Sequence, residues 1–387
     1  MNNQCLYRNK ELKELSDKTN FKHRPRPKFD WFIPIDGDGT HIGTDKAEIP
    51  PTFEYLKEVA LTAEENGFYS LLIPTRFSNG LFDENAPLAE TWTTVAALAS
   101  VTEKIRFLVA IRPGFISVGL FAQMAATLDQ ISDGRLDLNI VPGGIDGDME
   151  RLGEKANHDT RYERASEFIA ACQKLWDKPE AINFEGEFVN LNSAVCSPGP
   201  KGHPSFYLGG ASESALNLSA DKADTYLAWI LPREILGPHL DRVGKKYMDK
   251  GRSPKFGLRT HIIVRPSEKE AWEAADELLS KASDGVLKQR GTSSVNTAMV
   301  GRRSQTQKYE NDKMSTHLWN GISNVRVNCG TAIVGNADQV SEELLSYWKL
   351  GIDEFILSGF PHVEECNTVS EQLLPVLTEK IEENLQV

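Results

Sequence analysis

Short apolar runs alternate with longer amphipathic segments from Phe29 to the end of the chain. The apolar runs predict eight buried strands, at residues 29–35, 69–73, 105–111, 136–141, 205–208, 224–228, 256–264 and 353–357. Between them, apolar residues recur at helical spacing. We predict helices at 52–66, 88–101, 119–132, 160–177, 212–222, 233–250, 267–282 and 337–350, with a last helix at 364–384.

This alternation indicates an α/β protein with parallel strands, because strands that are apolar on both faces are typical of parallel sheets covered by helices. Eight strand–helix units without a reversal of order favour a closed (β/α)8 TIM barrel with insertions. A doubly wound open sheet is the alternative. No GxGxxG motif follows a first strand, which weakens that alternative.

Three segments do not follow the alternation. Residues 1–28 hold eight Lys/Arg against three Asp/Glu and predict a surface arm, or an arm that braces an oligomer. Residues 178–204 are an insertion with a small hairpin at 184–188. Residues 284–316 are long and polar, which is typical of a lid that orders on ligand binding or of a disordered loop. The domains are therefore the arm, 1–28, and the barrel, 29–387.

Composition narrows the class of protein. Hydrophobic residues make up 40% of the chain, which excludes disorder throughout, and the net charge of −12 argues against nucleic acid as the main partner. The five cysteines form neither a CxxC pair nor a disulfide framework, so we predict no metal. We find no apolar run that would span a membrane and no secretory signal, and we expect a cytoplasmic protein.

The strand ends carry the candidate chemistry, because active sites of such barrels lie at the C-terminal ends of the strands. These ends are rich in Arg, His, Gly and Pro and predict an anionic ligand; they are Pro34–Asp36, Pro74–Arg76, Arg112–Pro113, Pro142–Gly144, Gly209–Ser212, Trp229, Arg259 with His261, and Ser358–His362.

Arg259 and His261 are the clearest pair, since two residues of separation place both side chains on one face of the predicted strand. A buried arginine is costly unless it meets an anion. A structural ion pair is the alternative to a ligand. Among the strand ends only Asp36 and Asp38 could supply the carboxylate, so we favour the ligand.

Glycine turns follow two other strands. Gly209, Gly210 and Ser212 lie where a strand meets a helix, and free N–H groups there suit a phosphate. Pro142 lies in a similar turn, which either lines a ligand or is a plain turn. Trp229 either packs in the core or forms a flat wall of the pocket.

Many of these runs belong to a recognisable pattern. The matching stretches are 29–34 with 37–39 and 43–44, 72–75, 107–113, 123–129, His158 with 161–162, 207–212, 257–265, 330–335 and 357–362. Together they resemble the two-component, reduced-flavin-dependent alkanesulfonate monooxygenases of the bacterial luciferase-like family, over roughly residues 29–380.

The resemblance implies a luciferase-like barrel that receives reduced FMN from a separate NAD(P)H-dependent flavin reductase. With O2 it would cleave an organosulfonate into sulfite and an aldehyde. By this likeness Gly209, Gly210, Ser212, Tyr162, His158, Ala110 and Pro142 would hold the FMN. Arg259, His261 and Arg326 would hold the sulfonate, Trp229 would line the pocket, and 284–316 would be the lid. Members are usually homodimers or homotetramers.

Two departures from the family pattern affect the pocket. Arg76 and an insertion replace a cysteine, and Phe360 replaces a tyrosine before the Pro-His pair. His261 or His362 could take over the proton transfer. We therefore expect a substrate more polar than a plain alkanesulfonate, with sulfoquinovose preferred. The alternatives are a simple alkanesulfonate monooxygenase, a deazaflavin-dependent dehydrogenase on the same barrel, and a flavin-binding protein without activity.

Overall fold

Eight parallel strands close into a barrel, as the sequence predicts. The computed structural model describes residues 24–144, 149–295 and 313–386. The barrel strands are β1 (Lys28–Phe32), β2 (Ser70–Ile73), β3 (Arg106–Ile111), β4 (Leu136–Ile140), β7 (Phe206–Gly209), β8 (Thr225–Trp229), β9 (Lys255–Arg259) and β13 (Glu354–Ile356). They pair in the closed order β1-β13-β9-β8-β7-β4-β3-β2.

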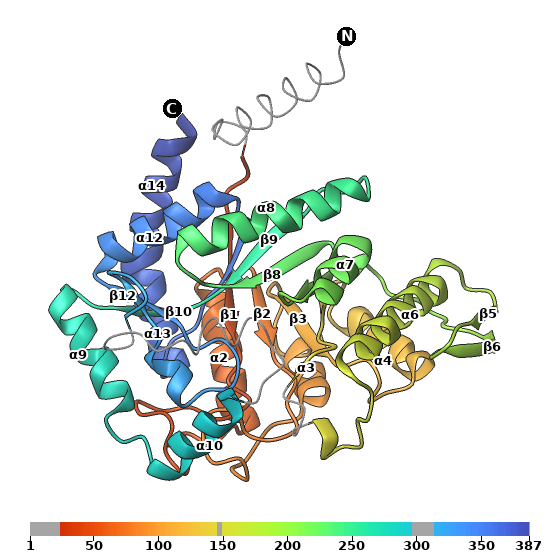
Figure 1. Cartoon of the computed structure of the whole chain (residues 1–387), viewed down its shortest axis with the longest axis horizontal. Helices are drawn as coiled ribbons and strands as arrows, with labels where there is room; N and C mark the ends of the chain where they lie inside the picture. The colour runs from red at the N-terminus through yellow and green to blue at the C-terminus, as the bar shows by residue number, and fades with distance from the viewer. Residues whose placement is uncertain (1–23, 145–148, 296–312, 387) are drawn as a thin grey trace.

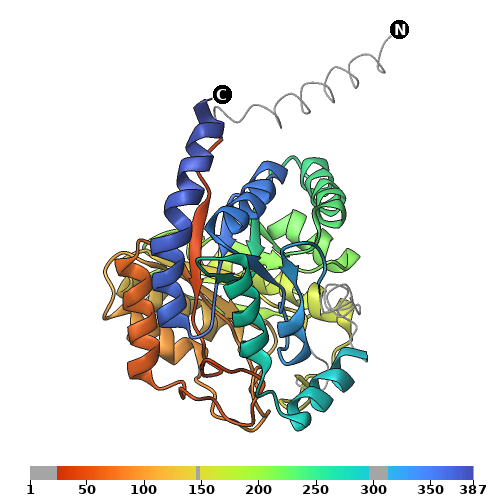
Figure 2. The same ribbon diagram turned by 90° about the vertical axis from the view of Figure 1, so that its left-hand side faces the viewer.

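Helices surround the barrel (Figures 1 and 2). All nine predicted helices form, within a few residues of the expected bounds. They are α2 (Phe53–Glu65), α3 (Thr91–Ala99), α4 (Val118–Ile131), α6 (His158–Asp177), α7 (Glu213–Lys222), α8 (Arg233–Asp249), α9 (Glu268–Leu279), α12 (Ala337–Leu350) and the C-terminal run of α13 (His362–Thr368), η4 (Val369–Leu373) and α14 (Leu374–Gln386). None of the described helices has the length and apolar character to cross a membrane.

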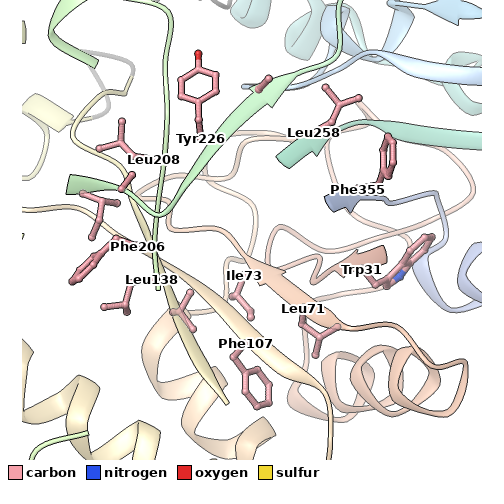
Figure 3. Close-up of a cluster of buried hydrophobic side chains, with 14 of the residues drawn as sticks. Trp31, Leu71, Ile73, Phe107, Leu138, Phe206, Leu208, Tyr226, Leu258 and Phe355 are labelled. Atoms are coloured by element: carbon pink, nitrogen blue, oxygen red, sulfur yellow. The ribbon is translucent and has the colours of Figure 1, made fainter. Parts of the chain in front are cut away.

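Strand alternation separates two apolar regions. Side chains on the outer face of the barrel, among them Trp31, Phe107 and Phe355, pack against the helices and form the main core (Figure 3). The inner face holds a smaller apolar layer made of Phe32, Leu72, Leu108, Tyr207 and Ile356, with Leu227 against it. We call these six residues the inner apolar layer. It divides the barrel interior into an N-terminal end and a C-terminal mouth.

The predicted strand at 256–264 is wrong in one respect, because two strands of different sheets occupy it. β9 ends at Arg259, and β10 (His261–Val264) begins a separate sheet with β12 (Ala332–Gly335) and β11 (Leu318–Trp319). The pairing partner changes at the junction: the Thr260 N–H donates to the Ile356 carbonyl, and the His261 N–H donates to the Thr331 carbonyl. The run is apolar on both sides of the break, so periodicity does not mark it.

The insertion at 178–204 contains the expected hairpin, formed by β5 (Ile182–Glu185) and β6 (Asn190–Ala194). It lies at the edge of the molecule, beside α4 and α6 (Figure 1). Only part of the predicted lid is loop-like: α10 (Asp284–Val295) is helical, and residues 296–312 lie outside the described residues. The Arg290 guanidinium donates to the carbonyls of Asn79, Phe82 and Val325, so it anchors α10.

The predicted N-terminal arm lies mostly outside the described residues, which begin at Arg24. The part that is described packs on the barrel. Arg24 donates to the Ile352 carbonyl at 3.0 Å, and Arg26 pairs with Glu382 of α14 at 2.9 Å. Lys28 already belongs to β1, so the barrel begins one residue earlier than predicted.

Buried carboxyl groups gather at the N-terminal end of the barrel. Asp30 is fully buried, and its carboxyl group hydrogen-bonds the carboxyl group of Glu354. Burial raises its pKa well above the usual range, and the neighbouring Glu354 raises it further. The Tyr207 hydroxyl donates to Glu354 at 3.1 Å. Asp137 differs, since it pairs with Arg106 at 2.8 Å.

We expect Asp30→Asn to stabilise the protein at pH 8. A carboxyl group with a raised folded-state pKa stabilises fully below its unfolded pKa, near 4, and that stability is lost as the pH rises toward the folded value. Asparagine cannot ionise, so the free energy of unfolding at pH 8 should rise by about 1–3 kcal/mol, with no gain at pH 4. Urea titrations at both pH values measure this. Asp137→Asn is the control and should destabilise; a loss of stability in Asp30→Asn at pH 8 would contradict the interpretation.

Candidate functional site

Two buried guanidinium groups lie over one aromatic ring at the barrel mouth. Arg259 ends β9, and Arg326 follows the short helix η3 (Gly321–Asn324). Their guanidinium carbons are 4.6 and 5.1 Å from the centre of the Phe32 ring. Both residues are about 95% buried or more, at 5% and 3% exposure. The ring faces provide part of the stabilisation that water would otherwise give.

Neither guanidinium group has a carboxylate partner among the described residues. Arg259 donates to the Ser358 hydroxyl at 2.7 Å and to the backbone carbonyls of Thr260 and Ile356. The Arg326 Nε is buried with no hydrogen-bond partner in the described chain. Burial lowers the pKa of Arg259 to about 10 and that of Arg326 to about 9. Both remain cations at neutral pH, and both therefore offer unused charge to an anion.

The nearby carboxylates are held elsewhere. Asp36 pairs with the Arg76 Nε at 2.8 Å, and the Asp38 Oδ2 contacts the His362 Nδ1 at 2.8 Å. The carboxyl groups of Asp30 and Glu354 lie at the opposite end of the barrel, below the inner apolar layer. The mouth therefore keeps a positive charge inside a net-negative protein.

Arg76, which we expect among the substrate-binding residues, is held by this pairing. Its side chain is only 4% exposed and is one half of the ion pair with Asp36. The Asp36 Oδ1 also accepts from the Gly80 N–H at 2.7 Å. The pair is a neutral, polar part of the mouth wall.

His261, which we expect in the site, has both of its ring nitrogens bonded to the protein. Its Nε2 lies 3.1 Å from the Cys329 carbonyl, and its Nδ1 lies 2.8 Å from the Ser358 hydroxyl. The carbonyl can only accept, so Nε2 carries the proton and Nδ1 accepts from Ser358. Burial and the two guanidinium groups keep the pKa of His261 well below 6.5. His261 thus supports Ser358 and Arg259 from behind, and it does not present a free nitrogen to a ligand.

His362 differs from His261 in one respect. Its Nδ1 meets Asp38, while its Nε2 is buried and has no partner among the described residues. The imidazole ring lies 5.9 Å from Phe32 and 5.1 Å from Phe360, the same two rings that contact Arg326. His362 therefore belongs to the group of residues around Phe32.

Trp229 completes this side of the mouth. It ends β8 and pairs in register with Arg259 on β9. Thr225, Leu227 and Trp229 alternate with the outer-core residues Tyr226 and Ala228, so Trp229 faces the barrel interior. Its partial exposure fits a pocket wall better than a core position.

The predicted phosphate-binding residues come together at the neighbouring strand ends. Gly209 ends β7, Gly210 has φ +127°, and Ser212 caps α7 by accepting from the Ala215 N–H at 3.3 Å. The Tyr162 hydroxyl, which hydrogen-bonds Ser212, lies against Gly210: a Cβ added there would approach it to 3.2 Å. The His158 ring is 4.9 Å from that of Tyr162.

Two further predicted cofactor residues line the approach to this turn. Ala110 lies on β3 on the same face as Leu108 of the inner apolar layer, so it faces the barrel interior. Pro142 is buried just after β4, next to Gly143, whose Cβ position is 3.3 Å from the Tyr162 hydroxyl. The described residues contain no group of His, Cys, Asp or Glu that could hold a metal ion.

Comparison with known proteins agrees with this geometry. Residues 28–354 match the family described as luciferase-like monooxygenase. The chain belongs to that family.

Several solved structures have a fold similar to that of this chain. A riboflavin lyase (RcaE) solved with modified FMN and riboflavin has a TM-score of 0.75 at 18% identity, covering 92% of each chain. A long-chain alkane monooxygenase (LadA) has 0.73 at 19% identity, covering 94% of this chain and 96% of that one. An F420-dependent secondary alcohol dehydrogenase has 0.64 at 16% identity, covering 91% and 99%. Identities this low establish the shared fold alone.

The sequence alone assigned no role to Phe32 or Ser358, although Ser358 is among the predicted strand ends. Phe32 carries both guanidinium groups, and Ser358 joins Arg259 to His261. Ser358 stands directly after a predicted strand, which is the signal that could have identified it. In the sequence, Phe32 looks like one more core residue of an aromatic run. It differs from Trp31 only because successive side chains of a strand point to opposite faces of the sheet.

We expect Arg326→Met to stabilise the ligand-free luciferase-like monooxygenase. A cation whose folded-state pKa is depressed destabilises the fold below that pKa, so the whole penalty is present at pH 7. Replacement by an apolar side chain of similar length should raise the free energy of unfolding by about 1–4 kcal/mol. Sulfite should raise the Tm of the native protein and leave that of the variant unchanged. Thermal denaturation with and without sulfite measures both effects.

The matched control is Arg76→Met, which leaves Asp36 buried without its cation. This variant should lose about 3–5 kcal/mol. If Arg326→Met were destabilised as much as Arg76→Met, the Arg326 charge would have a partner that our interpretation lacks.

Proposed function

We propose that the protein is a two-component, reduced-FMN-dependent monooxygenase that cleaves the C–S bond of an organosulfonate. The overall reaction converts R–CH2–SO3⁻, O2 and reduced FMN into the aldehyde R–CHO, hydrogen sulfite, water and oxidised FMN. The preferred substrate is sulfoquinovose. The proposal rests on membership of the luciferase-like family and on one observation about this chain, the pair of uncompensated guanidinium groups over Phe32.

That pair suits a sulfonate for a physical reason. Three equivalent oxygens share the sulfonate charge, so it can accept from two guanidinium groups at once. The charge on sulfur grows as the C–S bond breaks and sulfite forms. Arg259 and Arg326 already lie in a buried site, so they would stabilise this additional charge without reorganising.

The residues at the neighbouring strand ends fit a flavin phosphate. The hydroxyl groups of Tyr162 and Ser212, the exposed backbone at Gly210 and the N-terminus of the ten-residue helix α7 offer hydrogen-bond donors on one side of the mouth. Reduced FMN, when bound, supplies the two electrons that activate O2. Trp229 and Ala110 would border its ring, and the inner apolar layer would keep water away from below.

A hydroxylated substrate suits the neutral part of the mouth wall. The Arg76–Asp36 pair offers both donors and acceptors without adding net charge, which favours the hydroxyl groups of a sugar over an alkyl chain. This argument supports sulfoquinovose over a simple alkanesulfonate.

The proposal carries two partners with it. A separate NAD(P)H-dependent flavin reductase would supply the reduced FMN, and the chain would assemble as a homodimer or homotetramer in the cytoplasm. The alternative function is a dehydrogenase that uses a deazaflavin, favoured by the likeness of the fold to the F420-dependent alcohol dehydrogenase. Such an enzyme would need neither O2 nor a reductase.

Sulfite release decides between these functions. We expect sulfite from sulfoquinovose when reduced FMN and O2 are both present, and none when either is omitted, as measured with a thiol-reactive chromogen. A panel of alkanesulfonates should give at least tenfold lower kcat/KM. Release of sulfite from no sulfonate would contradict the proposal, and O2-independent oxidation of an alcohol with a deazaflavin would establish the alternative.

Arg259→Ala separates the substrate site from the flavin site. We expect the KM for the sulfonate to rise at least 10-fold, because a charge-assisted hydrogen bond to a buried anion is worth about 1.5–3 kcal/mol. The Kd for FMN, measured by fluorescence quenching, should stay within about twofold. Tyr162→Phe is the matched control and should weaken FMN while leaving sulfonate affinity intact. Equal losses of both ligands in Arg259→Ala would contradict these roles.

A further inference from the structure

A buried carboxylate holds one edge of the His362 ring. The Asp38 Oδ2 accepts from the His362 Nδ1 at 2.8 Å, from the His362 backbone N–H at 2.7 Å and from the Tyr55 hydroxyl at 2.5 Å. The Gly39 N–H donates to the Asp38 Oδ1 at 2.9 Å. Asp38 is fully buried and His362 is 1% exposed. Four donors on one carboxylate fix its orientation.

The loop that carries Asp38 is itself fixed. The Asp38 N–H and carbonyl exchange hydrogen bonds of 2.8 Å with Ile49, and His41 bridges Glu48 and Glu277 of α9. His362 is the first residue of α13, which follows β13 after the connection at 357–361. Two segments far apart in the sequence are thus clamped together at one rim of the barrel, through a pair of side chains that have no exposed surface.

This arrangement decides which nitrogen of His362 carries the proton. A carboxylate can only accept, so Nδ1 donates to Asp38 and the neutral ring keeps its lone pair on Nε2. Nε2 is buried without a partner among the described residues. A buried acceptor that the fold leaves unsatisfied is costly, and it is explained when a ligand supplies the missing hydrogen bond.

We propose that Asp38 is a positioning residue that holds His362 so that its Nε2 takes up a proton during carbon–sulfur cleavage. This inference rests on the proposed function and deepens it. It also separates the two histidines that the sequence left as alternatives, since both nitrogens of His261 are already bonded to the protein.

The step can be written with all atoms in place. Once the carbon next to sulfur has received one oxygen atom from O2, it carries a hydroxyl group and the sulfonate. The O–H proton moves to the His362 Nε2, and the O–H electron pair forms the second bond of the aldehyde C=O. The C–S electron pair leaves with sulfur as sulfite, next to the guanidinium groups, and the imidazolium ion is stabilised by Asp38.

The groups around His362 set the direction of its pH dependence. Asp38 lies against its Nδ1, Tyr55 of α2 donates to Asp38, and Glu365 of α13 is paired with Arg265 at 2.7 Å. His261 of β10 is close enough for the charge of His362 to lower the pKa of His261, and Arg259 and Arg326 lie across the Phe32 ring. Asp38 is the anion in direct contact with the His362 ring, and its replacement by asparagine removes that negative charge.

The experiment uses the full-length protein with selectively 15N-labelled histidine. At pH 8 the native protein should show an imidazole in the Nδ1–H form with a bare Nε2 that is missing from His362→Asn. The Nδ1 atoms of His158 and His317 also contact oxygen acceptors, so their signals should remain in that variant. Asp38→Asn should abolish the preference for that form. Detection of the Nε2–H form for His362 in the native protein, or an unchanged signal in Asp38→Asn, would overturn the proposal. This readout does not depend on turnover.

Turnover supplies the second readout. Asp38→Asn should lower kcat for sulfite release by on the order of 10²–10⁴-fold, with KM within threefold, and should move the acidic limb of the kcat–pH profile to lower pH. Tyr55→Phe keeps the carboxylate and removes one donor from it, so the limb should move slightly to higher pH with less than tenfold loss. A merely structural Asp38 would move neither limb, and unmoved limbs would overturn the proposal. If the native protein released no sulfite while the imidazole signal behaved as expected, the pairing of Asp38 with His362 would stand and its assignment to carbon–sulfur cleavage would fall.

Discussion

The site depends on two guanidinium groups that are buried beside one aromatic ring without a counter-charge. Moving a cation out of water is costly, and ion pairing is the usual compensation. Here Phe32, the Ser358 hydroxyl and backbone carbonyls supply only part of it. The remaining cost lowers the pKa values of Arg259 and Arg326. Binding an anion would stabilise this protein, because the anion supplies the electrostatic stabilisation that the two cations lose when they are removed from water.

The barrel maintains this imbalance by keeping its acids apart from its cations. Asp30 and Glu354 lie at the N-terminal end, where burial favours their neutral forms. The inner apolar layer separates them from the mouth. At the mouth itself the two aspartates of the loop after β1 are occupied, Asp36 by Arg76 and Asp38 by His362. Among the described residues, none of these four carboxylates therefore forms an ion pair with either of the two central arginines.

The sequence predicted the barrel because every barrel strand is a short apolar run followed by an amphipathic helix. The strand prediction failed where one apolar run covers two strands of different sheets. Nothing in residues 256–264 shows that the hydrogen-bond partner changes from Ile356 to Thr331 after Thr260. The small sheet of β10, β12 and β11 was missed for the same reason. Its strands are short, and β12 pairs with β10 across 71 positions of the chain (332 − 261), as the register of His261 with Ala332 shows. Pairing over such distances leaves no local pattern.

The site was predictable by residue type and by strand end, but not by partner. Arg259 and His362 were candidates because they stand at predicted strand ends, and Arg326 was a candidate through the family resemblance. The sequence could not show that Arg76 is paired with Asp36 or that His261 is bonded to Ser358. The partners differ in charge: Arg76 meets a carboxylate, whereas Arg259 donates only to neutral oxygens. Among the described residues, Arg259 and Arg326 lack a carboxylate partner and the Nε2 of His362 lacks a hydrogen-bond partner, and all three surround the Phe32 ring.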